Sequence, residues 1–212
     1  MADARALLRL ATWLSPAFPT GGFAWSGGLE AACAAGTVRD AAGLRARCET
    51  LLHHGGLRAD AVALAAVHAG EDADRMDALL RALAVSPERL AETVEQGEAF
   101  AAAAAPWFEA PLPPHVLPVV VGTATRRAGI DRAAAVVAFV NAALTQQVQA
   151  AQRLAPIGQA TATQVLAALE QEMLSVAEAI AAGAPREPAS FTPTKDIAAM
   201  GHGALPSRIF RS

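Results

Sequence analysis

Apolar residues recur along most of the chain at the three- and four-residue spacing of an α-helix. Val140, Leu144 and Val148 are one example. Such spacing places apolar side chains on one face of a helix, and that face packs against neighbouring helices. No segment alternates apolar and polar residues for long enough to predict a strand, and residues 119–121 are too few to decide. The pattern therefore predicts an all-α fold, a single-domain bundle of roughly eight to ten helices.

Capping residues and glycines mark the ends of the predicted helices. Asp40 and Asp131 each precede an apolar stripe, and Ser86 stands directly before Pro87. A side-chain oxygen at such a position accepts from free N–H groups of the first turn, and proline suits the first helical residue. The first predicted helix carries Leu7, Leu10 and Leu14, the second follows Asp40, the third spans about 58–69 and the fourth carries Met76 to Leu83. The next two run from Pro87 to Ala105 and from His115 to Arg127. Of the last two, one follows Asp131 and the other ends at Gly183.

Proline-rich segments interrupt the chain at two places. Five of the 13 prolines lie in residues 106–118, so no helix crosses that segment intact, and its aromatic residues predict a packed connection. From residue 184 onward the chain is again proline-rich. Such a tail buries little apolar surface alone, so it either docks on the bundle or folds against a partner. We predict a helical domain over residues 1–183 and a partner-docking tail over residues 184–212.

Residues 15–30 (SPAFPTGGFAWSGGLE) form a loop unlike the helical remainder. The prolines fix φ at about −65° and the glycines permit positive φ, so the segment is predicted to turn sharply. Its rings either pack into the domain or present an aromatic surface. We expect most of the loop to pack inward, and the residues that fix its shape are predicted to be Pro19, Gly21, Gly22, Phe23, Trp25 and Gly28.

Composition narrows the classes of function. The net charge of −3 provides no basic field, which argues against a nucleic-acid partner. The hydrophobic fraction of 53% reflects alanine, and no run reaches the roughly 20 apolar residues that span a membrane, so no membrane partner is expected. Cys33 and Cys48 lack metal-ligand spacing and are expected to be reduced thiols. No signal peptide is evident, and the expected location is the cytoplasm.

A search for catalytic or metal-binding groups finds little. The chain has no GxxxxGK[ST] motif for nucleoside triphosphates. His53 and His54 are adjacent, so on a helix they point about 100° apart and do not form a metal pair. We expect no enzyme activity, no cofactor and no resident metal site, and only His202 suggests a transient metal or partner role. One alternative stays open: a ligand-binding or enzymatic helical bundle that uses residues 15–30 as a pocket wall.

Four segments, taken in order, resemble the urease accessory protein F family. The first is Leu14–Glu30, with its proline-glycine-aromatic-serine sequence closing on Gly-Leu-Glu. The second is His115–Gly122 (HVLPVVVG), and the third is Ala150–Gln159 (AAQRLAPIGQ). The fourth is Met200–Ser212, which ends in SRIFRS. Together these segments extend over nearly the whole chain in the order that the family shows.

The resemblance implies an all-helical, non-enzymatic assembly factor. It implies that the protein bridges accessory protein D, also called H, and the GTPase accessory protein G in a complex that acts on apo-urease. By family analogy the complex supports GTP-dependent nickel delivery and formation of the carbamylated lysine that holds the two metals, with a dimer of the F protein at its centre. The GTP chemistry belongs to the GTPase, which agrees with the missing phosphate-binding motif.

Within these segments we expect specific residues to contact partners. Ser26 and Glu30 are the candidates in the loop. Arg153 either contacts the GTPase or caps the end of its helix, and the sequence favours neither role over the other. In the tail, a guanidinium suits a partner carboxylate and an aromatic ring suits an apolar pocket. The candidate tail residues are His202, Arg208, Phe210 and Arg211.

The sequence departs from the family pattern at three places. Gly203 stands where the family usually has an acidic residue, and Leu205-Pro206 replaces an aromatic residue. Residues 92–100 resemble a family helix without its customary arginines. These differences bear on partner affinity at those positions.

Overall fold

The computed structural model describes residues 3–183 and 187–212, and all regular structure in these ranges is helical. The all-α prediction is therefore confirmed for this part of the chain. Its helices are α1 (Ala4–Trp13), α2 (Leu29–Ala34), α3 (Ala41–His53), α4 (Gly56–Ala69), α5 (Ala73–Ala82), α6 (Pro87–Ala104), α7 (Leu117–Arg127), α8 (Arg132–Leu154), α9 (Gln159–Ala181) and α10 (Pro193–Met200), with short 3-10 turns at Gly22–Ala24, Ala105–Trp107 and His202–Ala204.

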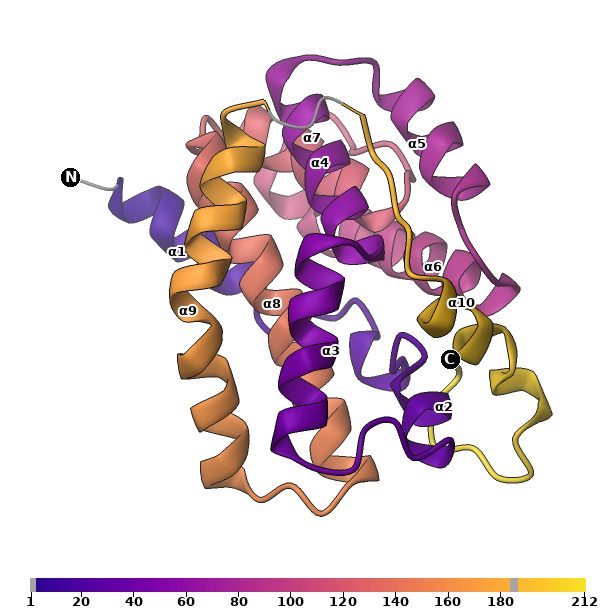
Figure 1. The fold of residues 1–212 in the computed structure, drawn as a ribbon. Helices are drawn as coiled ribbons and strands as arrows, with labels where there is room; N and C mark the ends of the chain where they lie inside the picture. Colours follow the sequence, from indigo (N-terminus) through magenta and orange to yellow (C-terminus); the bar gives the residue numbers. More distant parts are fainter. Residues whose placement is uncertain (1–2, 184–186) are drawn as a thin grey trace.

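The helices pack around α4 and α8. The long helices α8 and α9 form an antiparallel pair, and α3 packs against α9 (Figure 1). On the other side α4 packs against α7, which in turn contacts α6, and α5 lies at the outer edge (Figure 1). From residue 187 the chain passes α5, where Glu187 pairs with Arg75, and the end of α3, where the Phe191 N–H donates to the His54 carbonyl, and it reaches α10, which lies beside α2 (Figure 1). The tail and the loop before α2 are thus brought to the same end of the molecule.

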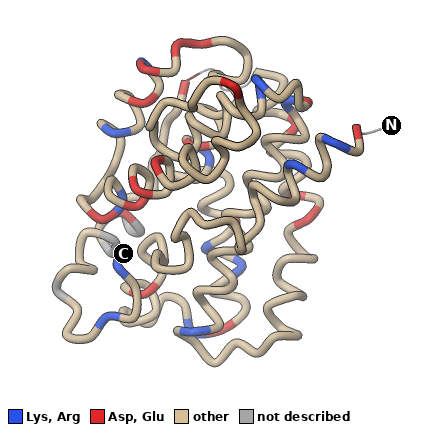
Figure 2. The backbone as a smooth tube through the Cα atoms, turned by 180° about the vertical axis from the view of Figure 1, so that it is seen from behind, with Lys and Arg blue, Asp and Glu red and all other residues tan. Residues whose placement is uncertain are grey.

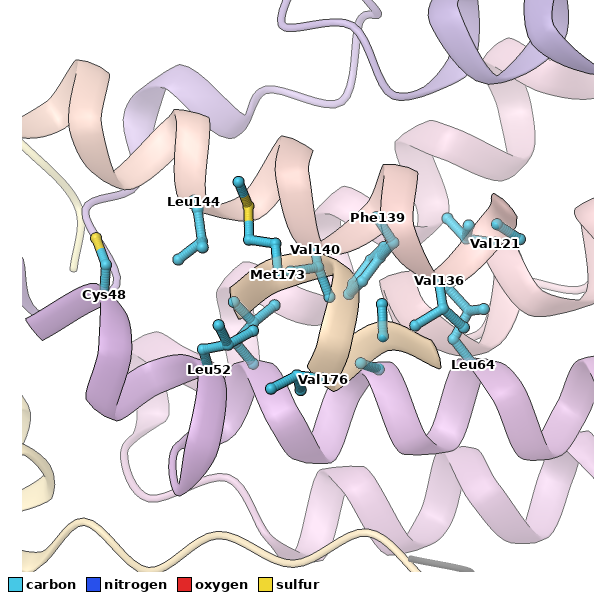
Figure 3. Close-up of a cluster of buried hydrophobic side chains, with 14 of the residues drawn as sticks. Cys48, Leu52, Leu64, Val121, Val136, Phe139, Val140, Leu144, Met173 and Val176 are labelled. Carbon is cyan, nitrogen blue, oxygen red and sulfur yellow. The ribbon is translucent and has the colours of Figure 1, made fainter. Parts of the chain in front are cut away.

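The hydrophobic core lies between these layers. Leu52 of α3 and Leu64 of α4 meet side chains of α8 and α9, among them Phe139 and Met173 (Figure 3). Leu52 and Leu64 are both fully buried. Burying a leucine side chain contributes about 1.5–3 kcal/mol, so this cluster fixes α3 and α8 relative to each other. The position of α3 relative to α8 is important because side chains of both helices hold the loop that precedes α2.

Two glycines allow the helices to approach closely. A Cβ atom added at Gly122 of α7 would stand 2.7 Å from the Leu64 carbonyl oxygen of α4. A Cβ atom added at Gly97 of α6 would collide with the His115 carbonyl oxygen. Because not even a Cβ atom fits at either position, glycine is required there for α4, α6 and α7 to pack as one layer.

The predicted helix starts are confirmed by their capping hydrogen bonds. Asp40 accepts from the Gly43 N–H at 2.9 Å, and Ser86 accepts from the Arg89 N–H at 3.1 Å. Asp131 accepts from the third residue of its helix at 2.9 Å. Each cap satisfies an N–H group that has no partner within the helix, as the sequence led us to expect.

The predicted apolar face of the first helix is partly wrong. Leu7 is 63% exposed, and the buried residues of α1 are Leu10 and Trp13. The first turns of α1 project from the bundle, so only the last part of the helix finds a surface to cover (Figure 1). The leucine spacing identified the helix but not the side that packs.

Two helices were not predicted, and one undecided segment is helical. The helix α2 is only six residues long, too short for its apolar spacing to repeat. The helix α10 lies in the proline-rich tail and begins with a proline, which the first turn of a helix tolerates. Residues 119–121, undecided from the sequence, belong to α7.

The proline-rich connection before α7 is packed, as predicted. The Phe108 ring lies 5.6 Å from the Trp13 ring, and Leu112 is buried. The division at residue 183 stays a prediction, and its first tail residues, 184–186, lie outside the described part of the chain.

Charged residues of both signs are distributed along the helices (Figure 2). Acidic positions gather around α5, where Glu71, Asp72, Asp74 and Asp77 follow closely in sequence. Among the described helices, none is both long and apolar enough to cross a membrane.

Candidate functional site

The loop before α2 is folded by its glycines. Gly21, Gly27 and Gly28 have φ angles of 74°, 58° and 79°, in the left-handed region that favours glycine. Between them lie the 3-10 turn and an extended Trp25. Gly21 and Gly28, two of the glycines predicted to fix the shape of the loop, therefore have a backbone reason to be glycine, and Gly27, which was not among the predicted residues, has the same one.

The aromatic residues of the loop differ in their surroundings. Phe18 and Trp25 are buried, at 8% and 3% exposure, and Leu29 is fully buried. Phe23, expected to fix the loop from inside, is 78% exposed, so that expectation is wrong. It lies within the 3-10 turn and is held through its backbone carbonyl, while its ring points to solvent.

The carbonyl groups of the loop face side chains of α3 and α8. Gln146 donates to the Gly22 carbonyl at 2.8 Å, and Gln147 donates to the Ser26 carbonyl at 2.8 Å. Two arginines complete the set: Arg47 Nη2 donates to the Gly27 carbonyl at 2.5 Å and Arg153 Nη1 donates to the Phe23 carbonyl at 2.9 Å. The bundle thus holds the loop along its backbone.

The opposite side of the loop holds the tail through one carboxylate. Glu30 accepts the backbone N–H of Ile209 at 2.6 Å and that of Phe210 at 3.0 Å, and the His202 ring lies 3.1 Å from it. Burial alone would raise the pKa of Glu30, but the hydrogen bonds from Ile209, His202 and Phe210 outweigh burial and hold the pKa below its usual value. An ionised, buried carboxylate is therefore the anchor of the tail.

Ser26 and Ser212 join the loop to the last residue of the chain. The Ser212 hydroxyl accepts the N–H groups of Ser26 and Gly27 at 3.2 and 3.1 Å. The Ser26 hydroxyl donates to the Ser212 carbonyl and accepts the Glu30 N–H at 3.2 Å. Ser26 and Ser212 are both buried, so these contacts are shielded from water.

Two arginines, Arg211 of the tail and Arg153 of α8, make further contacts between the tail and the bundle. The Arg211 guanidinium lies 4.3 Å from the centre of the Trp25 ring and pairs with Glu95 through both nitrogens, at 2.5 and 2.8 Å. Its hydrogen bonds lower the pKa of Glu95. The Arg153 guanidinium lies 4.1 Å from the centre of the Phe210 ring. Cations over aromatic faces are attracted by the ring electrons, so both contacts favour the docked tail.

The structure thus brings most of the predicted site residues together, within one chain. Ser26, Glu30, His202 and Phe210 are buried where the loop and tail meet. The sequence shows no acidic neighbour for His202, yet its ring lies against Glu30, which is 172 residues away. Arg208 stands apart, exposed on the outside of the tail. Contact of any of these residues with a partner stays a prediction.

Sequence reasoning missed a partly buried charged cluster between α4 and α6. Arg89 pairs with Asp60, and Arg89 Nη1 lies 3.5 Å from Glu92. Burial raises the pKa of both carboxyls, and Arg89 only partly offsets it. The signal was present: Glu92, Gln96 and Phe100 lie four residues apart on one buried stripe of α6.

Two cavities meet at this cluster. One, of about 170 Å³, extends toward Gly27 and Ser212. The other, of about 240 Å³, is lined by Trp13, Phe23 and Trp25. Trp13 Nε1 is a buried polar atom without a hydrogen-bond partner there, and Glu92 Oε2 faces Arg89 Nη1 at 3.5 Å. The alternative function, a ligand-binding bundle walled by the loop, would place its ligand in this second cavity.

Metal-binding side chains do not gather in the described residues. Among these residues, no group of three or more His, Cys, Asp and Glu side chains could hold a metal ion. The ring of His53 lies 2.5 Å from Glu172 of α9, at the end of α3.

Fold and site together define an all-helical protein in which a glycine-rich loop holds the C-terminal segment of the same chain. The UreF family model matches residues 38–170, and the chain belongs to the urease accessory protein F (UreF) family. It is 44% identical to urease accessory protein UreF of Rhizobium etli, over 99% of this chain and 98% of the relative. It is 45% identical to UreF of Rhizobium leguminosarum over the same shares, and 41% identical to UreF of Cereibacter sphaeroides over 98% of this chain and 99% of the relative.

Proposed function

We propose that this protein is a urease maturation factor that bridges accessory protein D and the GTPase accessory protein G in the cytoplasm, and so supports GTP-dependent insertion of nickel into apo-urease. Membership of the UreF family supports a role of the chain as an accessory factor in urease maturation. The bridging role is more specific than family membership. It is supported chiefly by the way the tail is held on the loop.

The docked tail presents an apolar outer surface. Its inner residues His202, Phe210 and Ser212 are buried, whereas four large apolar residues are more than half exposed. Exposed apolar side chains gathered in one segment are typical of protein interaction sites. These exposed tail residues are Phe191, Ile197, Met200 and Ile209.

This arrangement divides the proposed roles among the predicted partner residues. We assign Arg208, which is exposed beside Ile209, to direct contact with accessory protein D. Ser26, Glu30, His202 and Phe210 are buried, so they would act by holding the tail in the shape that the partner meets. We assign Arg153, which is exposed at the end of α8, to the GTPase.

A homodimer is part of the same proposal. Leu7 and Leu8 of α1 are 63% and 68% exposed, and we expect a second copy of the chain to cover them. The carbamylated lysine and the nickel ions belong to urease, and nickel is the cargo of the proposed complex.

Co-expression with urease tests the maturation role. Urease produced with its other accessory proteins but without this chain is expected to contain little nickel and to show little activity. Adding the chain should restore both, because the GTPase would then be brought to apo-urease. Equal nickel content with and without the chain would contradict the proposal.

A further inference from the structure

The peptide group between Ser26 and Gly27 is held on both of its sides. Its N–H, which belongs to Gly27, donates to the Ser212 hydroxyl at 3.1 Å. Its carbonyl, which belongs to Ser26, accepts from Gln147 Nε2 at 2.8 Å. Since a peptide group is planar, the direction of the carbonyl fixes the direction of the N–H. By holding the Ser26 carbonyl, Gln147 therefore directs the Gly27 N–H toward Ser212 of the tail. Its own hydrogen bonds are to the loop and to Arg47.

Arg47 orients Gln147 in turn. The Arg47 Nε atom donates to Gln147 Oε1 at 3.1 Å, which turns the amide nitrogen of Gln147 toward the loop. The Arg47 Nη2 atom donates to the carbonyl of Gly27, the residue after Ser26, at 2.5 Å. Arg47 and Gln147 are only 5% and 8% exposed, so bulk solvent has little access to these side chains. One guanidinium thus fixes both the loop and the side chain that holds the loop.

The loop has an intrinsic need for such support. Gly27 and Gly28 both have positive φ, and glycine has the widest choice of backbone conformations. Without donors to its carbonyls, the segment would be free to rotate its peptide groups away from Ser212. The supporting side chains come from α3 and α8, which the hydrophobic core holds in place.

We propose that Arg47 and Gln147 are positioning residues: they set the Ser26–Gly27 peptide so that it receives the tail, and thereby control partner binding that depends on the docked tail. The second half of this inference rests on the proposed function, in which the docked tail binds accessory protein D. The first half concerns the isolated chain alone. The two halves can therefore be tested separately.

Hydrogen exchange on the full-length chain tests the first half. In Arg47→Met and in Gln147→Leu, the amides of Ile209 and Phe210 should exchange on the order of tenfold faster than in the wild type, because a lost hydrogen bond loosens the docked tail. Core amides of α4 and α8 should keep their protection. Arg45→Met is the matched control: Arg45 is exposed on the same helix and pairs with Glu49, so tail exchange should not change.

The double variant supplies a second measurement. Because Arg47 acts partly through Gln147, the combined effect on tail exchange should be smaller than the product of the two single effects. Arg47→Lys should loosen the tail as well, since a single ammonium does not reproduce the two-pronged contact of a guanidinium. Wild-type tail protection in Arg47→Met and Gln147→Leu would overturn the proposal. Equal loss of protection in tail and core would also overturn it, because the pair would then be merely structural.

Recovery of accessory protein D by the same variants tests the second half. We expect it to fall in proportion to the loss of tail protection. If the tail loosens while recovery of accessory protein D stays at the wild-type level, control of partner binding is overturned and the tail is not the binding element. The positioning of the loop would still stand on the exchange data.

Discussion

Glu30 is the residue at which loop and tail depend on each other most closely. Two backbone N–H groups of the tail and the His202 ring converge on its carboxylate, in a position that is 6% exposed. Hydrogen bonds to a charged group contribute roughly 1.5–3 kcal/mol each, about twice as much as those between neutral groups. Removing this one carboxylate would leave several buried donors without an acceptor.

The lowered pKa of Glu30 predicts a pH dependence with a definite sign. A carboxyl whose pKa is lower in the folded protein than in the unfolded chain stabilises the fold above the unfolded pKa, here 4.5, and this contribution is lost as the pH falls through the folded pKa. Asp60 and Glu92 have raised pKa values and act in the opposite direction. The effect of Glu30 must therefore be measured against Glu30→Gln, which cannot ionise.

Chemical denaturation of the two proteins as a function of pH makes this comparison. The wild type should exceed Glu30→Gln in free energy of unfolding by a constant amount at about pH 6 and above, and by less and less below pH 4.5. A difference that stays the same down to about pH 3 would show that the Glu30 charge does not hold the tail.

At the residue scale, the contacts of the predicted site residues could not be derived from the sequence. Ser26, Glu30, His202 and Phe210 were singled out as partner contacts, and all four lie in one buried site. Their contacts join positions more than 170 residues apart, which no local periodicity encodes. Arg47 and Gln147 were missed because a single buried polar side chain on an apolar helix face has no distinctive spacing.

At the scale of the element, helices were predictable where spacing and caps agreed. The helix after Asp131 begins at Arg132, and the helix after Ser86 begins at Pro87. The short helix α2 and the tail helix α10 offered too few turns for the apolar period to show. What α1 covers depends on the bundle beside it, so spacing alone placed Leu7 on the wrong side.

The exposed leucines of α1 give this helix a prediction of its own. Covering each leucine in a dimer would contribute up to about 1.5–3 kcal/mol, so replacing Leu7 and Leu8 together by Gln should weaken the dimer by at least about tenfold. Glutamine keeps a high helix propensity, and α1 should stay folded. Light scattering over a range of concentrations measures the change.

The matched control for this test is Arg5→Gln, a substitution at an exposed charged position on the same helix. It should leave the dissociation constant unchanged. A Leu7→Gln and Leu8→Gln double variant that forms dimers as tightly as the wild type would show that α1 is not the interface.

At the scale of the whole molecule, the bundle serves as a frame for the tail. The core fixes α3 and α8, these helices hold the carbonyls of the loop, and the loop offers its amides and Glu30 to the tail. The outer face of the tail carries the exposed apolar residues. In the proposed function, this outer face of the tail is the surface that accessory protein D would bind.

Capture of accessory protein D by a variant that lacks Phe191–Ser212 is the sharpest test of whether the tail binds this partner. Arg45→Met, at an exposed position of α3 outside the contacts between loop and tail, serves as the companion variant: it keeps the tail residues, and we expect it to recover accessory protein D as the wild type does. Circular dichroism verifies that each variant keeps its helical core. We expect the folded deletion variant to recover no accessory protein D. Wild-type recovery by that folded variant would contradict this expectation.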